Sequence, residues 1–170
     1  MEGTPMTTAV DAGTYGKLWD MIRDVRVAML TSRDGPVLRS RPMVAVQDRF
    51  EGQLFFFTRA ASHKVDEVQQ DEEVNLSYAD PKSENYVSLS GTATLVRDPD
   101  LIRSLWRESL RVWFPKGQGD PDIAVLRIDV SQAEYWDAPS STMLHLWGYA
   151  KAVTTGQPPQ PGGHARVNLS

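Results

Sequence analysis

Two arginines on one predicted strand are the residues whose chemistry is easiest to interpret. Arg39 and Arg41 lie in the segment VLRSRPMVAV, residues 37–46, whose composition favours a strand. Side chains two positions apart on a strand point to the same face, so the two guanidinium groups repel each other unless an anion lies near them. Strand arginines can equally be solvated or paired in salt bridges. The pair alone therefore leaves both an anion site and a salt-bridge arrangement open.

A set of hydroxyl and ammonium groups follows at the next strand end and helix start. Thr58 closes the aromatic segment LFFFT, and Ser62 and Lys64 open a helix predicted over residues 62–70. Hydroxyls, the free N–H groups of a first helical turn and an ammonium can converge on a phosphate at such a junction. Together with the arginine pair, this order of residues predicts a phosphate site built into an antiparallel sheet.

The composition disfavours several other kinds of site. The chain has 170 residues, no cysteine, and three histidines without metal-ligand spacing, so thiol chemistry is excluded and no metal site is predicted. A net charge of −4 and a pI near 5.3 provide no basic surface for nucleic acid. No apolar run approaches the roughly 20 residues of a membrane helix, and the N-terminus does not read as a signal peptide. We therefore expect a cytoplasmic protein that binds neither nucleic acid nor a membrane.

The order of elements predicts a mainly β domain of the α+β class. Strands are expected at residues 26–32, 37–46, 54–58, 72–79, 84–96, 122–130 and 131–137. Because the connections are turn-length, a doubly wound parallel sheet is excluded, and a six- to seven-stranded antiparallel split β-barrel with peripheral helices fits best. Gly91, inside the longest predicted strand, indicates a bulge or bend.

Two further helices and the domain limits complete the expected organisation. An amphipathic helix is predicted near residues 15–25, and another over residues 98–114 with Asp98 as its N-cap and Pro99 at its first position. Residues that suggest a buried stripe on the second helix are Leu101, Ile102, Leu105, Trp106 and Trp113. We expect a flexible N-terminus at residues 1–10, one domain over 11–150, and a flexible Pro- and Gly-rich tail over 151–170.

The chain resembles the FMN-binding split barrels related to pyridoxamine 5′-phosphate oxidase, and within them the general stress protein 26 type. The likeness covers roughly residues 14–137 and is carried by LRSRPM, FFFTRAASHK, YVSLSGTATLV, WFPKGQGDPDIAVLRIDV and AEYWD. The resemblance implies a homodimer in which FMN lies in a groove between the two subunits. FAD is also conceivable if the groove is open beyond the phosphate.

The resemblance also implies roles for individual residues. Residues 39–43 match the strand that contacts the flavin and its phosphate, and Thr58, Ser62 and Lys64 match the phosphate and ribityl contacts. His63 stands where oxidase members carry an arginine. Two tryptophans match regions where the other subunit approaches the flavin, although plain packing remains open for both. The expected flavin-binding residues are Arg39, Ser40, Arg41, Pro42, Met43, Phe57, Thr58, Ser62, His63, Lys64, Trp113 and Trp136.

The function implied by the resemblance is that of a flavin-binding stress-associated protein, with a flavin-dependent oxidoreductase or flavin reductase using NAD(P)H as one hypothesis. Residues 98–117 lack the Tyr, Arg and Ser arrangement that binds the substrate phosphate in pyridoxamine phosphate oxidases, so vitamin B6 oxidation is disfavoured. Two alternatives stay open. One is a non-catalytic flavin-binding or sensing module. The other is a reductase that uses the deazaflavin F420, for which Arg59, Lys82 and Lys116 are the available basic residues. No catalytic residue is assigned.

Overall fold

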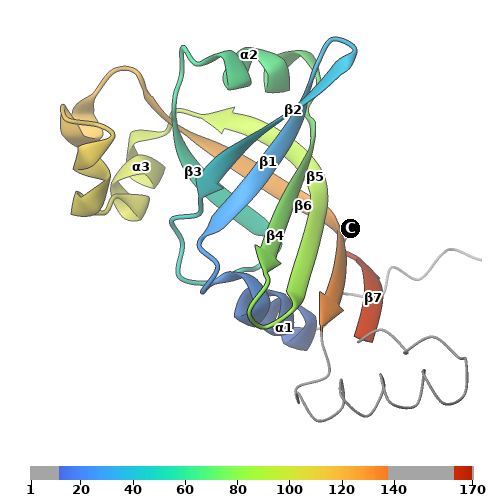
Figure 1. The fold of residues 1–170 in the computed structure, drawn as a ribbon. Coiled ribbons are helices and arrows are strands. Elements are labelled where there is room, and N and C mark those ends of the chain that lie inside the picture. Colours follow the sequence, from blue (N-terminus) through green and yellow to red (C-terminus); the bar gives the residue numbers. More distant parts are fainter. Residues whose placement is uncertain (1–11, 138–162, 170) are drawn as a thin grey trace, which may run out of the picture.

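An antiparallel sheet of seven strands organises the part of the chain that the structure describes, residues 12–137 and 163–169 of a computed structural model (Figure 1). The strand order is β2-β1-β4-β5-β6-β3, with β7 paired to β6, and every pairing is antiparallel. The predicted fold class is thus confirmed. The strands are β1 (Val27–Asp34), β2 (Val37–Val44), β3 (Gln53–Arg59), β4 (Glu73–Asp80), β5 (Asn85–Val96), β6 (Ile123–Asp137) and β7 (Gly163–Asn168). The helices are α1 (Ala12–Ile22), α2 (His63–Gln70) and α3 (Pro99–Leu105), with 3-10 segments η1 (Glu108–Val112) and η2 (Gly117–Gly119).

The sheet curls into a barrel whose seam lies between β2 and β3. These two strands do not pair with each other along their length. The chain beyond β2 closes the seam at one place, where the N–H of Val46 donates to the carbonyl of Phe55 at 3.1 Å and the side-chain oxygen of Gln47 accepts from the N–H of Phe55 at 2.9 Å. Within the strands themselves, β2 and β3, on which a flavin site is predicted, are not joined by strand pairing.

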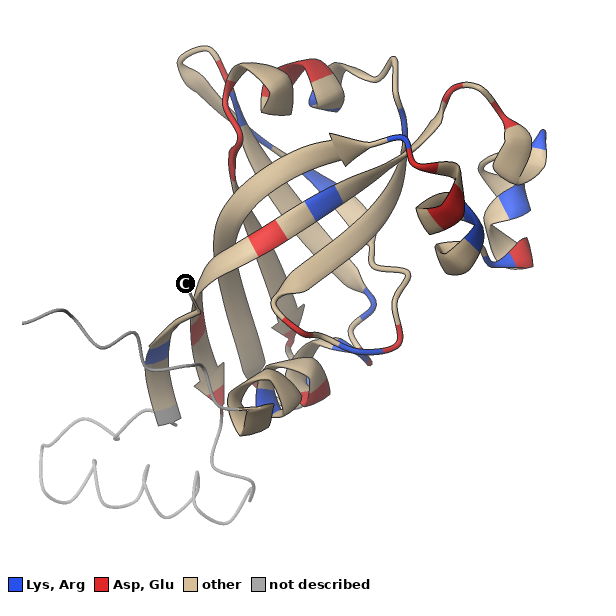
Figure 2. Cartoon of the chain, turned by 180° about the vertical axis from the view of Figure 1, so that it is seen from behind, with Lys and Arg blue, Asp and Glu red and all other residues tan. Residues whose placement is uncertain are grey.

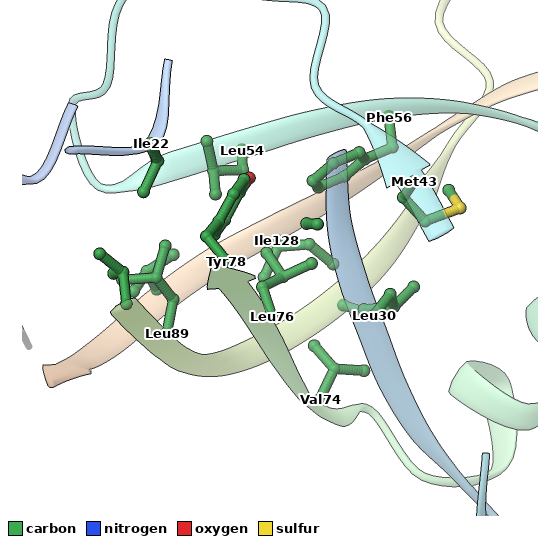
Figure 3. Packing of buried hydrophobic residues seen from close by; sticks show 14 of the residues in the cluster. Ile22, Leu30, Met43, Leu54, Phe56, Val74, Leu76, Tyr78, Leu89 and Ile128 are labelled. Atoms are coloured by element: carbon green, nitrogen blue, oxygen red, sulfur yellow. The ribbon is translucent and has the colours of Figure 1, made fainter. Parts of the chain in front are cut away.

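Alternate residues of the strands fill the barrel. The inward-facing side chains of β1, β3, β4 and β5 form one apolar core with the buried face of α1, as Figure 3 shows for part of the cluster. Fully burying one such aliphatic or aromatic side chain stabilises the fold by roughly 1.5–3 kcal/mol. Leu18 and Ile22 are the α1 residues that are buried, at the spacing that predicted an amphipathic helix. Charged residues lie mainly on the helices and loops around the barrel (Figure 2).

Gly91 forms the predicted bulge. The register between β5 and β6 shifts between Ser90 and Gly91. A Cβ built on Gly91 would lie 2.1 Å from the carbonyl oxygen of Asp129, so only glycine allows the two backbones to approach this closely. The bulge lets β5 follow β6, which is one strand of 15 residues. The prediction of two separate strands at 122–130 and 131–137 is therefore wrong, because the strand continues without a break.

The helix predicted over residues 98–114 is shorter than expected. Asp98 is its N-cap, and its side chain accepts from the N–H of Asp100 at 2.9 Å, as predicted. The α-helix ends at Leu105, however, and a separate 3-10 segment, η1, follows. The break changes the direction of the side chains beyond it. Ile102 is buried but Trp113 is 72% exposed, so Trp113 is not part of a buried stripe.

The C-terminal residues include a strand where the sequence predicts a flexible tail. β7 pairs with β6 from Gln132 to Asp137. Two apolar β7 side chains, Ala165 and Val167, are half-buried, and Leu169 beyond the strand joins the core. Apolar and polar residues alternate in β7, which favours a strand, although the Pro- and Gly-rich composition of the whole segment predicts a flexible tail. Residues 1–11, 138–162 and 170 lie outside the described part, and with them the predicted N-terminal segment and most of the tail. None of the described helices is long and apolar enough to cross a membrane.

Candidate functional site

The structure brings residues predicted from β2 and α2 to one cavity of about 340 Å³. The cavity lies between β2 and the first turn of α2, beside the seam of the barrel. The residues that line it are Arg39, Ser40, Arg41, Ser62, His63, Lys64 and Glu67. We call Arg39, Arg41, Thr58, Ser62 and Lys64 the basic cluster. Thr58 does not line the cavity itself, but it is hydrogen-bonded to two residues that do.

Lys64 is the centre of the basic cluster. Its Nζ donates to Thr58 Oγ1 at 3.1 Å, and Thr58 Oγ1 lies 3.3 Å from Ser62 Oγ. Ser62 is the N-cap residue of α2, but its hydroxyl makes no capping hydrogen bond and stays with Thr58. Burial lowers the pKa of Lys64, and the charge of Arg41 lowers it further. No carboxylate pairs with this ammonium among the described residues.

The two arginines have carboxylate partners from the protein itself. Both line the same cavity, as the strand spacing predicts. Arg39 pairs with Asp34 at 2.8 Å in an exposed ion pair, and water and salt weaken such pairs. Arg41, by contrast, forms a largely buried ion pair with Glu67 and also donates to Ser32. The salt-bridge alternative is thus realised for both arginines, and the exposed pair of Arg39 is the more easily opened.

Glu67 is the most unusual side chain at this site, because it is a carboxylate that is only 2% exposed. Burial opposes its ionisation, yet hydrogen bonds from Ser32 and Arg41 keep the pKa of Glu67 below its ordinary value. Both bonds go to Oε2. Oε1 has no hydrogen-bond partner in the described part of the chain, and His63 Nε2 lies 3.4 Å from it. Glu67 therefore holds Arg41 in place from inside the fold.

Asp34, His63 and Glu67 place three potential metal ligands within 4.8 Å of one another. Carboxylate and imidazole groups of this kind bind divalent cations. However, Arg39 and Arg41 already neutralise the two carboxylates, and Lys64 adds a further positive charge nearby. A divalent cation would meet unfavourable repulsion there. The local charges favour an anion over a metal ion.

The balance of charge fits a phosphate monoester. Three cationic side chains face two carboxylates around the cavity, so one positive charge is left without compensation. The uncompensated group is Lys64, which is half-buried beside the hydroxyls of Thr58 and Ser62. A buried charge is costly unless it is paired, and charge-assisted hydrogen bonds to phosphate oxygens would supply the pairing.

The other predicted residues of β2 do not turn side chains into the basic cluster. Strand alternation directs Ser40 and Pro42 to the outer face, where the hydroxyls of Ser40 and Thr31 lie 2.6 Å apart. Met43 is 8% exposed and packs in the core. Their predicted contacts with a flavin therefore depend on their backbone groups, and they stay predictions.

The three predicted aromatic residues lie away from the cavity within one chain. Phe57 points to the side of β3 opposite Thr58 and packs edge-on against Trp106, with ring centroids 5.9 Å apart. Trp113 is exposed at the end of η1. Trp136 is 38% exposed and stacks on His164, with centroids 5.1 Å apart and an interplanar angle of 8°. None of them lines the cavity.

Sequence reasoning missed the carboxylates of the site. Glu67 lies four residues after His63 and three after Lys64, and this spacing places the three side chains on neighbouring positions of one helix face. Asp34 immediately precedes the Gly-Pro turn that leads back to Arg39, so the hairpin brings the two together. Both signals are present in the sequence, although neither is specific without the strand register.

The comparisons with known proteins assign the family. The sequence profile of the family described as "Pyridoxamine 5'-phosphate oxidase like" matches residues 13–160. The chain therefore belongs to this family. Among curated proteins, Protein bli-3 of Neurospora crassa is 31% identical over 144 residues, which are 78% of this chain and 69% of that protein.

Solved structures agree with the family assignment. A protein assigned as general stress protein 26 from Jannaschia sp. CCS1 has a TM-score of 0.73 and 26% identity, covering 93% of this chain and 99% of its own. The general stress FMN/FAD binding protein of Xanthomonas citri has a TM-score of 0.68 and 26% identity, covering 77% of this chain and 93% of its own. The barrel is thus the split barrel of this family, with general stress protein 26 type structures among its neighbours.

Proposed function

We propose that this protein binds FMN, with the phosphate held by the basic cluster. The observation that carries the proposal is Lys64, a half-buried ammonium that has hydroxyl neighbours and no carboxylate partner among the described residues. Membership of the family supports it, as does the similarity to a Xanthomonas citri protein named for FMN/FAD binding. FAD is the second candidate ligand, because the exposed side of the cavity at Arg39 leaves room for a group attached to the phosphate.

The side chains of the basic cluster would divide the work of binding. Lys64 and the hydroxyls of Thr58 and Ser62 would contact phosphate oxygens directly. Arg39 would leave Asp34 to do the same, since its present ion pair is exposed. Arg41 is held by Glu67 and would contribute mainly its charge. When bound, the flavin supplies hydride and electron transfer, and the protein positions it and shields it from water.

We propose further that the protein is a homodimer with flavin at the subunit interface. Three apolar side chains on the outer face of β1 and β2, those of Val27, Met29 and Val44, are 44%, 40% and 50% exposed. The register places Val27 opposite Val44 and Met29 opposite Pro42, so these residues form one patch. An apolar patch of this kind commonly marks an interaction surface, and a two-fold axis lets it cover itself.

The exposed tryptophans support the same arrangement. Trp113 and Trp136 are large apolar side chains that the single chain leaves 72% and 38% exposed. In a dimer, a second subunit could present such side chains to the flavin and exclude water from its ring. This would explain why neither lies near the basic cluster of its own chain.

The proposed activity is that of a flavin-dependent oxidoreductase, such as a flavin reductase that uses NAD(P)H. Electron transfer by the flavin would not require a nucleophilic side chain from the protein. The loss of NAD(P)H absorbance in the presence of flavin and an acceptor tests this activity. A bound flavin that no donor reduces would instead favour a flavin-holding protein without turnover.

A titration with two flavins tests the phosphate site itself. FMN and riboflavin differ only by the phosphate, so the ratio of their dissociation constants measures what the phosphate contributes. Flavin fluorescence quenching would give both constants for the wild type, Lys64→Gln and the control Lys82→Gln, whose exposed side chain lies away from the cavity. We expect Lys64→Gln to weaken FMN binding about ten- to hundredfold and to leave riboflavin binding unchanged. Equal FMN affinity in the two variants would refute the assignment.

A further inference from the structure

His63 lies between two carboxylates at the edge of the cavity that the basic cluster surrounds. Its Nε2 atom is 3.2 Å from Asp34 Oδ2 and 3.4 Å from Glu67 Oε1. The other ring nitrogen, Nδ1, is 4.0 Å from Asp66 Oδ2. The side chain is 62% exposed, so it adds little to the packing of the core. Both ring nitrogens of His63 are thus directed at carboxylates.

Asp34 is shared between His63 and Arg39. Asp34 Oδ2 accepts from Arg39 at 2.8 Å, and His63 Nε2 lies 3.2 Å from the same oxygen. The bond from Arg39 is the main reason that the pKa of Asp34 lies below its ordinary value, and the bond to His63 is the second. The two partners come from different elements, because Arg39 lies on β2 and His63 begins α2, which lies beside the β1–β2 hairpin (Figure 1). Asp34 therefore keeps one partner when the other leaves.

The proposed flavin site requires Arg39 to leave Asp34 for the phosphate. An unpaired carboxylate would then face a phosphate dianion, and like charges that lie close together repel each other. His63 lines the same cavity as Arg39 and is already within hydrogen-bond distance of Asp34. It is therefore in a position to keep the carboxylate paired while the guanidinium moves.

The surroundings of His63 disfavour a direct contact with the phosphate. A phosphate oxygen at Nε2 would lie beside the negative charges of Asp34 and Glu67. At Nδ1 it would meet Asp66. Lys64, by contrast, has hydroxyl neighbours and no carboxylate partner among the described residues. The phosphate is thus expected at Lys64, and His63 is expected to act through Asp34.

We propose that His63 is a positioning residue that releases Arg39 to the phosphate. In the ligand-free protein, Arg39 and His63 share Asp34. When FMN binds, the N–H at Nε2 of His63 stays with Asp34, and Arg39 turns to a phosphate oxygen. This role rests on the proposed function, since it needs a phosphate in the basic cluster. It requires no contact between His63 and the flavin.

A double-mutant cycle of His63→Ala and Asp34→Asn tests this role. Fluorescence quenching gives the dissociation constants of FMN and riboflavin for the wild type, the two single variants and the double variant. His63→Ala should weaken FMN binding about fivefold, because Arg39 then stays with Asp34. Asp34→Asn frees Arg39 from the start, so it should tighten FMN binding, and adding His63→Ala should then change nothing. Riboflavin, which has no phosphate, should bind all four proteins equally.

Two further variants separate this role from a general effect of structure or charge. The amide N–H of glutamine can still donate to Asp34, so His63→Gln should bind FMN within about twofold of the wild type. Asp71→Asn is the matched control for Asp34→Asn. Asp71 also pairs with an arginine, Arg33, and the two carboxylate side chains are 33% and 36% exposed, but neither Asp71 nor Arg33 lines the cavity. FMN affinity in Asp71→Asn should equal that of the wild type.

The cycle has outcomes that would overturn this role of His63, with thermal unfolding confirming that each variant is folded. One is an equal loss of FMN affinity on His63→Ala in both backgrounds, since His63 would then act independently of Asp34. Wild-type FMN affinity in His63→Ala would do the same, as would a His63→Gln variant as weak as His63→Ala. If Lys64→Gln still reduces the preference for FMN over riboflavin, these results leave the basic cluster in place. A wild type that binds FMN and riboflavin equally would refute both proposals.

Discussion

Replacing Glu67 by glutamine should change stability and flavin affinity in opposite directions. Glutamine keeps the shape of the side chain and can still accept from Ser32 and Arg41, but it removes the negative charge. The variant therefore leaves Arg41 without a counter-ion in a position where its side chain is 18% exposed. The same change raises the positive charge beside the cavity by one unit. The first effect acts on folding and the second on the phosphate.

The stability loss can be sized from the burial of the pair. Removing one partner of a fully buried ion pair costs about 3–5 kcal/mol. Here Arg41 retains some contact with water and glutamine retains neutral hydrogen bonds, so we expect a loss of about 2–3 kcal/mol in the free energy of unfolding. For a domain of this size each kcal/mol lowers Tm by about 2–4 °C, which gives a decrease of roughly 5–10 °C.

The gain in affinity follows from releasing Arg41. An arginine freed from its carboxylate can make a charge-assisted bond to a phosphate oxygen, which contributes about 1.5 kcal/mol or more. We therefore expect FMN to bind Glu67→Gln about tenfold more tightly than the wild type. Riboflavin, which has no phosphate, should bind both equally.

Thermal unfolding without ligand and FMN titration below the new Tm measure the two effects separately. Glu73→Gln is the matched control, because Glu73 is exposed on β4 and away from the cavity. An unchanged Tm would show that the pair between Glu67 and Arg41 contributes little to folding. FMN affinity equal to or below that of the wild type would refute the placement of the phosphate beside Arg41.

Three further results are expected. As the pH rises, FMN affinity should begin to fall at a pH lower than the ordinary lysine pKa of 10.5, because burial lowers the pKa of Lys64 and the phosphate binds its charged form. Lys64→Arg should keep its FMN affinity to higher pH, and identical pH profiles for the two proteins would count against this role of Lys64. Gly91→Ala should lose about 2–3 kcal/mol of unfolding free energy in urea, since its Cβ would meet the carbonyl of Asp129, whereas Gly16→Ala, which meets nothing, should not be destabilised. Trp113→Ala should leave Tm unchanged because the side chain is exposed, yet weaken FMN binding if it covers the flavin of a second subunit; wild-type FMN affinity would argue against that contact.

The strands were the most predictable part of the fold. Alternation in β1, β3 and β4 shows directly which residues are inside, and Asp34-Gly35-Pro36 specifies the β1–β2 hairpin, with Gly35 at a φ of +57°. The end of α3 was less predictable, because helical spacing continues from Leu101 through Trp113 even though the α-helix stops at Leu105. β7 was not predicted, because the Pro- and Gly-rich sequence before it favoured a flexible tail over the whole segment.

The basic cluster was predictable because its residues are close in sequence and each lies at a strand or helix boundary. Lys64, Ser62 and Thr58 come together through one strand, one turn and one helical turn. The partners of Arg39 and Arg41 depend on tertiary placement. Arg41 meets Glu67 only because α2 packs against β1, the strand that pairs with β2, and sequence spacing does not encode that contact.

Two buried polar side chains, Glu67 and Tyr78, each carry an atom without a hydrogen-bond partner, and each lines a cavity. Glu67 Oε1 and Tyr78 Oη are the buried side-chain atoms of the described chain that have no hydrogen-bond partner. A sequence selected for stability alone would replace Tyr78 by phenylalanine, because the hydroxyl then costs desolvation and contributes nothing. The buried carboxylate of Glu67 is neutralised by Arg41. Its burial is therefore explained by its role in holding Arg41 in the basic cluster, and Glu67 need not bind a ligand itself.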